Sequence, residues 1–99
     1  MAGFAQIMEF KTTRIDEGQK IIDEYNERTK DKRARGRAML LSDRDNENTY
    51  FAVVEFPSYE EAQRNNDMPE TQELSQKLDA LTDGGTKFRN LDILRVDED

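Results

Sequence analysis

Apolar residues recur with the two-residue period of a β-strand in four segments of this chain, and with helical spacing in the stretches between them. The strand patterns cover Phe4 to Lys11, Arg37 to Ser42, Tyr50 to Phe56 and Phe88 to Val96. Strands that alternate with helical stretches restrict the choice of small folds, because the apolar face of each helix must pack on the sheet that the strands form.

The first helical stretch follows the first strand. Thr13 and Asp16 have the spacing of a capping box, which predicts that a helix begins there. The basic residues up to Arg35 are expected to end this helix, with Gly36 as a left-handed stop. One helical face then carries Ile15, Gly18, Ile21, Ile22 and Tyr25.

The second helical stretch follows the third strand and is interrupted. Ser58 and Glu61 form another capping-box pattern, which predicts a short helix. Pro69 suits the first turn of a further helix, and that helix ends before Gly84 and Gly85. Its apolar face carries Leu74, Leu78 and Leu81.

The order strand, helix, strand, strand, helix, strand predicts an α+β chain with the ferredoxin-like arrangement. That arrangement builds a four-stranded antiparallel sheet with the helices on one face. Residues 43–48 are turn formers and are expected to close a hairpin. Ninety-nine residues predict a single domain over 1–99.

Both faces of the predicted sheet are apolar, so both are expected to be covered. The set Ala5, Ile7, Phe51, Val53, Leu91 and Ile93 is the more uniformly apolar one and is assigned to the helix side. The opposite set contains Phe4, Gln6, Met8, Phe10, Tyr50, Ala52, Val54, Phe56, Asn90, Asp92, Leu94 and Val96. This second face is expected to pack on a second copy and to include a ligand cavity.

Composition excludes several classes of site. The chain has no histidine and no cysteine, which rules out His-ligated haem, a Ser-His-Asp triad and Cys- or His-based zinc sites. No stretch of the sequence reads as a signal peptide or a membrane span, and a cytoplasmic location is expected. The net charge of −7 argues against general nucleic-acid binding.

The chain resembles the antibiotic-biosynthesis-monooxygenase-like (ABM) group of the dimeric α/β-barrel superfamily. The segments that carry the resemblance are residues 50–62, Met68 to Glu73 and Phe88 to Ile93. The resemblance implies a homodimeric α/β barrel in which two sheets meet face to face. The superfamily includes cofactor-free oxygenases, haem degraders, decarboxylases and isomerases, and the missing histidine excludes the haem-degrading branch.

Three polar residues are the candidates for catalysis. Asp92 is a candidate general base if burial raises its pKa, and the alternative is an ion pair across a dimer with Arg37 or Arg44. Tyr50 and Asn90 are candidate hydrogen-bond donors to a substrate oxygen. The alternative for Tyr50 is a strand-end tyrosine with its hydroxyl in water.

Four further residues are expected to line the ligand cavity: Gln6, Met8, Met39 and Val54. Gln6 alternatively satisfies a backbone group, and the two methionines alternatively fill the core. No cofactor and no metal are expected. The acidic turn with Asp43, Asp45 and Glu47 does not have the spacing of an EF-hand.

The segment from Arg28 to Arg37 carries six basic residues and one acidic residue, a net +5. The segment lacks aromatic residues, so a solvated helix end is favoured over an RNA site.

Two main hypotheses for the function follow from the sequence as a whole. The first is a cofactor-independent monooxygenase acting on a small aromatic or polyketide-like molecule. The second is a non-catalytic homodimer that binds a small hydrophobic molecule or acts as a scaffold.

Overall fold

The computed structural model describes residues 3–33 and 36–98. The elements in this part of the chain follow the predicted order, with the second helical stretch divided in two. They are β1 (Phe4–Lys11), α1 (Ile15–Thr29), β2 (Ala38–Ser42), β3 (Thr49–Phe56), α2 (Tyr59–Asn66), α3 (Pro69–Asp79) and β4 (Lys87–Asp92).

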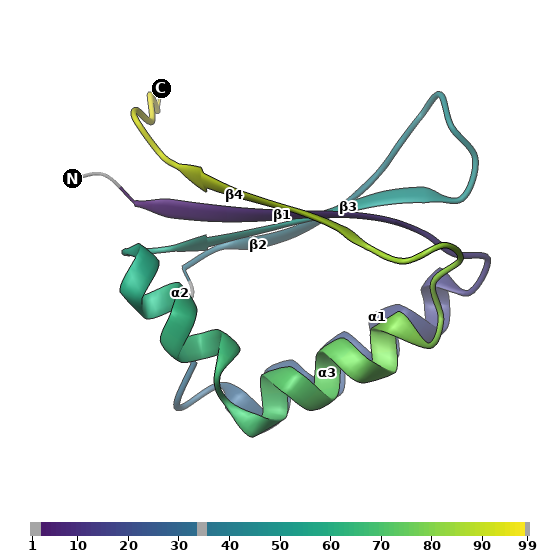
Figure 1. The fold of residues 1–99 in the computed structure, drawn as a ribbon, viewed down its shortest axis with the longest axis horizontal. Helices are drawn as coiled ribbons and strands as arrows, with labels where there is room; N and C mark the ends of the chain where they lie inside the picture. Colours follow the sequence, from purple (N-terminus) through teal and green to yellow (C-terminus); the bar gives the residue numbers. More distant parts are fainter. Residues whose placement is uncertain (1–2, 34–35, 99) are drawn as a thin grey trace.

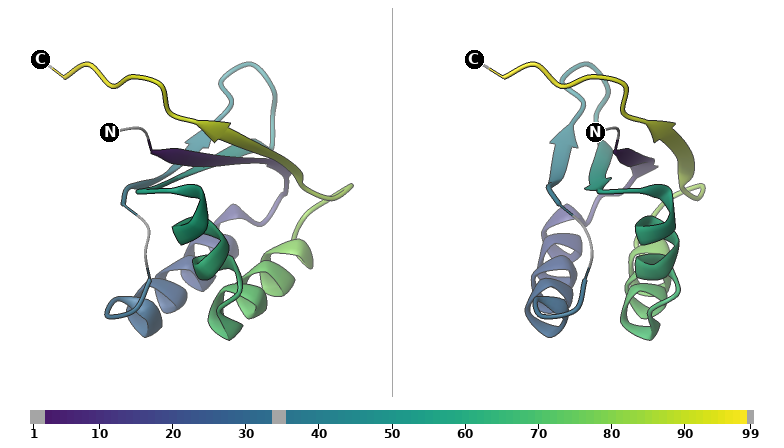
Figure 2. Two further views of the ribbon diagram at one scale, coloured as in Figure 1. Left: turned by 60° about the vertical axis from the view of Figure 1, so that its left-hand side comes forward. Right: turned by 90° about the vertical axis from the view of Figure 1, so that its left-hand side faces the viewer.

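The strands form one antiparallel sheet in the order β2-β3-β1-β4. All three helices lie on one side of it, with α1 and α3 side by side below the sheet and α2 at one end (Figure 1). The two views of Figure 2 show the same two layers. The predicted ferredoxin-like α+β fold is therefore confirmed.

The assignment of the two sheet faces is wrong, and the structure reverses it. Phe4 pairs with Phe56, and these two buried side chains form a core cluster with Ala62 of α2. Residues directly opposite each other in an antiparallel pair point to the same face. The face that contains Phe4, Gln6, Met8, Val54 and Phe56 therefore lies under the helices.

The opposite face is open in the single chain. We call it the open face, and it carries Ala5, Ile7, Met39, Leu41, Phe51, Val53 and Leu91. Both faces are apolar, so strand parity separates the two sets but does not say which one the helices cover. Of the polar members of the mixed set, only Gln6 borders the cavity between the sheet and the helices.

Two helix ends differ from their predicted form. The side chain of Thr13 does not cap α1, whose N-cap residue is Arg14. Thr12 organises the turn instead, because its hydroxyl accepts from the Arg14 amide (3.0 Å) and donates to the Leu81 carbonyl (2.6 Å). By contrast, the predicted Ser58 cap is confirmed, since the Ser58 hydroxyl accepts from the Glu61 amide at 3.1 Å.

Helix α1 also ends earlier than predicted, at Thr29. Gly36 does not have a positive φ angle, so it is not the left-handed stop. Arg33 closes the helix end instead by donating to the carbonyl and the side-chain oxygen of Asn26. The predicted end at Arg35 lies outside the described residues.

The last strand is shorter than predicted, because β4 ends at Asp92 and not at Val96. Gly84 and Gly85, which precede it, both have positive φ angles, as a tight connection requires. The Ile93 amide donates to the Gly3 carbonyl at 2.8 Å, and the chain then leaves the sheet.

Candidate functional site

A cavity of about 490 Å³ lies between the sheet and the helices. Its size suits a small organic molecule. Helices α1 and α3 pack on each other. The cavity is bordered by side chains from the inner face of the sheet and from the helices. Its mostly apolar lining includes Met8, Ile22, Ala52, Val54, Leu78 and Phe88.

Polar groups of three helices meet in the cavity wall. The hydroxyls of Tyr25 in α1 and Thr71 in α3 are hydrogen-bonded at 2.8 Å. The amide nitrogen of Asn65 in α2 donates to the Tyr25 hydroxyl at 3.5 Å. Tyr25 is only 8% exposed and Asn65 only 5%, and all three residues line the cavity. We call these three residues the polar cluster.

The four residues predicted to line a cavity all border this one. Gln6, Met8 and Val54 lie on the helix-covered face, so their cavity is inside the single chain and not between two sheets. Met39 pairs with Val53 of the open face, so its side chain belongs to that face even though the residue borders the cavity.

The three predicted catalytic residues lie on the same face but not in the cavity lining. The side-chain oxygen of Asn90 accepts from the Gln6 amide at 3.2 Å, which connects Asn90 to the cavity through one side chain. The Tyr50 ring packs on Phe10, with 5.9 Å between ring centroids. Asp92 is exposed on the edge strand β4, without the burial that its predicted role as a base requires. Their catalytic roles stay predictions.

The sequence reasoning missed the polar cluster. Tyr25 was assigned to the apolar face of its helix, and that placement is consistent with its burial. Nothing in the sequence distinguishes Asn65 from its exposed neighbour Asn66, because its importance comes from a contact with a residue 40 positions away.

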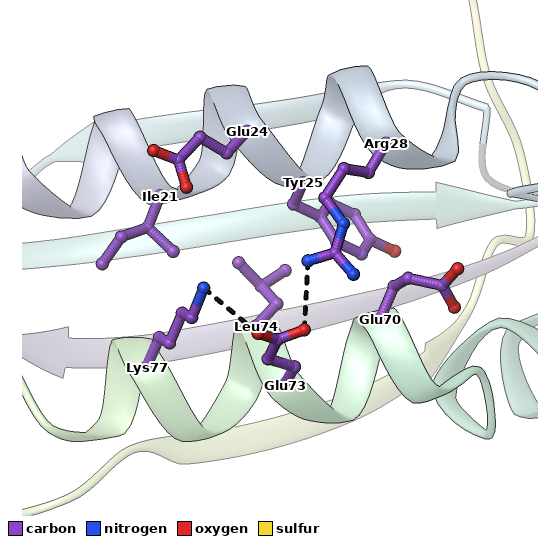
Figure 3. Close-up of a pocket in the computed structure, with 8 residues that line it drawn as sticks. All are labelled: Ile21, Glu24, Tyr25, Arg28, Glu70, Glu73, Leu74 and Lys77. Carbon is purple, nitrogen blue, oxygen red and sulfur yellow. Dashed lines mark hydrogen bonds and ion pairs between the residues drawn. The ribbon is translucent and has the colours of Figure 1, made fainter.

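Ion pairs close the outer side of the α1/α3 seam (Figure 3). Glu73 accepts from Arg28 at 3.0 Å and pairs with Lys77 at 3.2 Å. Glu70 pairs with Lys32. The hydrogen bonds from Arg28 and Lys77 lower the pKa of Glu73, and the one from Lys32 lowers the pKa of Glu70. The dimple at this seam has a volume of only about 10 Å³, enough for a single water molecule.

The basic segment is engaged within the chain. Four of its basic residues form ion pairs with glutamates of the chain: Arg28 with Glu73, Lys30 with Glu27, Lys32 with Glu70, and Arg37 with Glu55. Arg33 binds the end of α1. These contacts are consistent with the expectation that the segment is a solvated helix end.

The acidic turn has a structural explanation. The Asp43 carboxylate accepts from the Asp45 amide and the Asn46 side chain, both at 2.9 Å, and these bonds lower the pKa of Asp43. Within residues 3–33 and 36–98 no three acidic side chains are grouped as a metal site requires. No helix in the same part of the chain has the length and apolarity to span a bilayer.

Solved structures share this architecture. SnoaB, a cofactor-independent oxygenase from Streptomyces nogalater, superimposes with a TM-score of 0.80 over 95% of both chains, at 16% identity. A conserved protein from Methanosarcina mazei Go1 gives a TM-score of 0.80 at 11% identity over 92% of both chains. An antibiotic biosynthesis monooxygenase gives a TM-score of 0.74 at 14% identity, over 93% of this chain and 99% of that one.

The chain has the ABM-like fold. No protein-family model and no curated protein matches the sequence. At identities of 11–16%, the likeness establishes the architecture, and activity has to be argued from the site itself.

Proposed function

We propose that this ABM-like chain is a cofactor-independent monooxygenase that acts on a small aromatic molecule. The observation that carries the proposal is the internal cavity of about 490 Å³, which combines an apolar lining with the buried polar cluster. Such a cavity holds a flat apolar ring and orients one of its oxygen atoms. SnoaB, which has the same architecture, is a cofactor-independent oxygenase.

The chemistry requires no metal or organic cofactor when the substrate is itself the reductant. A phenolate transfers electrons to dioxygen, and a ring CH₂ group becomes a carbonyl. One oxygen atom enters the product and the other leaves as water. The buried hydroxyl of Tyr25, which accepts from the Asn65 amide, stabilises the phenolate oxygen by donating a hydrogen bond to it.

A carboxylate takes up the phenol proton. Asp23 of α1 and Asp79 of α3 line the cavity and Asp92 does not. All three carboxylates are exposed, so position in the lining, and not burial, is the reason for preferring Asp23 and Asp79. We therefore expect Asp23→Asn or Asp79→Asn to slow turnover more than Asp92→Asn does. If Asp92→Asn alone abolishes turnover while the protein still binds the ring, Asp92 is the base.

A second copy of the chain covers the open face in this proposal. Leu41 and Leu91 are 44% and 43% exposed there, beside the half-buried Ile7, Phe51 and Val53. A charge at Ile7 disrupts that contact, so Ile7→Lys is expected to give a folded monomer by sedimentation velocity. Met8→Lys, which lies under the helices, is expected to destabilise the fold. A dimeric Ile7→Lys protein would contradict the face-to-face arrangement.

The second hypothesis, a binding module without turnover, has one specific observation in its favour. The chain lacks histidine, cysteine and tryptophan, so it has few side chains for redox or proton-transfer chemistry. The two functions differ in oxygen consumption, because a binding module retains the aromatic molecule unchanged.

The test uses a dihydroxyanthrone as the probe and an oxygen electrode as the readout. We expect one dioxygen consumed for each carbonyl formed, and we expect Val54→Trp, which fills the cavity, to abolish both binding and turnover. Gln76→Trp, an exposed position on α3, is the matched control. Retention of the anthrone without oxygen consumption would identify a binding module. Turnover that survives Val54→Trp would place the site elsewhere.

A further inference from the structure

The segment after β4 crosses the sheet on its open side. Figure 1 shows it leaving the end of β4 away from the helices, and in the right-hand view of Figure 2 it passes over the other strands. Arg37 lies next to β2 at the opposite edge of the sheet. Its pKa is raised mainly by the hydrogen bond and charge of Glu55, and the nearby charge of Glu98 adds a smaller contribution. Residues 93–98, which we call the strap, thus span the sheet from edge to edge.

The strap alternates apolar and charged residues as a strand does, but it is not part of the sheet. Leu94 is 92% exposed and Val96 is 64% exposed, the two highest values among the large apolar side chains in the described part of the chain. Arg95 and Asp97 form an ion pair with each other at 2.9 Å. The apolar side chains of the strap are therefore left in water in the single chain.

We propose that the strap is a contact element for a second copy of this chain, with Leu94 and Val96 packed on the partner. The inference rests on the proposed dimer through the open face. The strap adds a second contact that stabilises this dimer. The strap lies on the same side as the open face, so a copy that covers this face also meets Leu94 and Val96. Packing on the partner removes both side chains from water, which the single chain does not do.

Charge complementarity favours the same occupant. The end of the strap is acidic, with Asp97 and Glu98, whereas the outer row of β4 carries Lys87 and Arg89. Within residues 3–33 and 36–98 neither Lys87 nor Arg89 forms an ion pair. Each copy thus offers an acidic strap and two cations on one side of its sheet, the self-complementary pattern that a twofold dimer needs.

The experiment compares two double variants of the full chain by sedimentation equilibrium over a range of concentrations. Leu94→Ser with Val96→Ser removes the apolar contacts. Gln72→Ser with Gln76→Ser introduces the same two serines at exposed positions of α3, on the helix side of the molecule, and is the matched control. We expect the dimer dissociation constant to rise at least tenfold in the first variant and less than threefold in the second.

The outcomes distinguish failure of the strap proposal from failure of the face-to-face dimer. Equal dissociation constants for the parent and the Leu94→Ser/Val96→Ser variant would overturn the strap while leaving the dimer intact. A parent chain that is monomeric throughout would overturn both. Ile7→Lys separates them further: if it stays dimeric while Leu94→Ser/Val96→Ser dissociates, the strap holds the dimer and the face-to-face contact is wrong.

Discussion

The polar cluster makes a quantitative prediction, because one tyrosine hydroxyl joins all three helices around the cavity. Tyr25→Phe removes the 2.8 Å hydrogen bond to Thr71 and the longer contact with Asn65 while keeping the ring. A neutral hydrogen bond contributes about 0.5–1.5 kcal/mol to stability, and a contact at 3.5 Å adds little. We expect Tyr25→Phe to lower the free energy of unfolding by about 1 kcal/mol.

A double-mutant cycle isolates the pair. We expect Tyr25→Phe and Thr71→Val to be coupled by about 0.5–1.5 kcal/mol, measured by urea unfolding at one fixed protein concentration so that self-association does not shift the result. Tyr59→Phe is the control, because Tyr59 is half exposed and contacts Phe4 through its ring. A coupling energy indistinguishable from zero would refute the assignment of Tyr25 and Thr71 as a hydrogen-bonded pair.

Three more outcomes follow from the contacts. Ser58→Ala is expected to lower stability by about 1 kcal/mol in urea unfolding, whereas Thr13→Ala changes it little, because only Ser58 caps a helix. Ala62→Leu is expected to lower stability by about 1–3 kcal/mol, since Ala62 is 1% exposed and has no room for three more carbons. Arg28 and Lys77 lower the pKa of Glu73 in the folded chain, so their stabilisation is present above its ordinary pKa of 4.5 and is lost as the pH falls. Unfolding free energies across that range are therefore expected to fall less steeply for Glu73→Gln, and equal slopes would contradict this role.

Local patterns predicted the elements well. The bounds of β1 were predicted as observed, and Pro69 begins α3 as its missing amide hydrogen allows. Helix ends were less predictable, because a cap depends on which neighbour reaches the free backbone group. Thr12 and Thr13 are chemically identical, and the contact of Thr12 with Leu81, 69 residues away, decides which one organises the turn.

For the candidate site, the sequence predicted only which strand residues share one face of the sheet. Gln6, Met8 and Val54 were grouped correctly because a strand places alternate residues on one face. Which layer covers that face depends on where the helices pack, and this is a tertiary property. Asn65 was not predictable for the same reason, since its hydrogen bond to Tyr25 exists only after α1 and α2 come together.

The reversal of the two faces changes what each half of the molecule does. If the mixed face had packed on a second copy, the ligand site and the dimer contact would have been one surface, and no substitution could have separated them. With Gln6, Met8 and the polar cluster under the helices, the cavity belongs to a single chain. In the proposed dimer, the open face and the strap then serve association alone. Binding and dimerisation are therefore expected to fail independently: Ile7→Lys should leave anthrone binding intact, and Val54→Trp should leave the dimer intact.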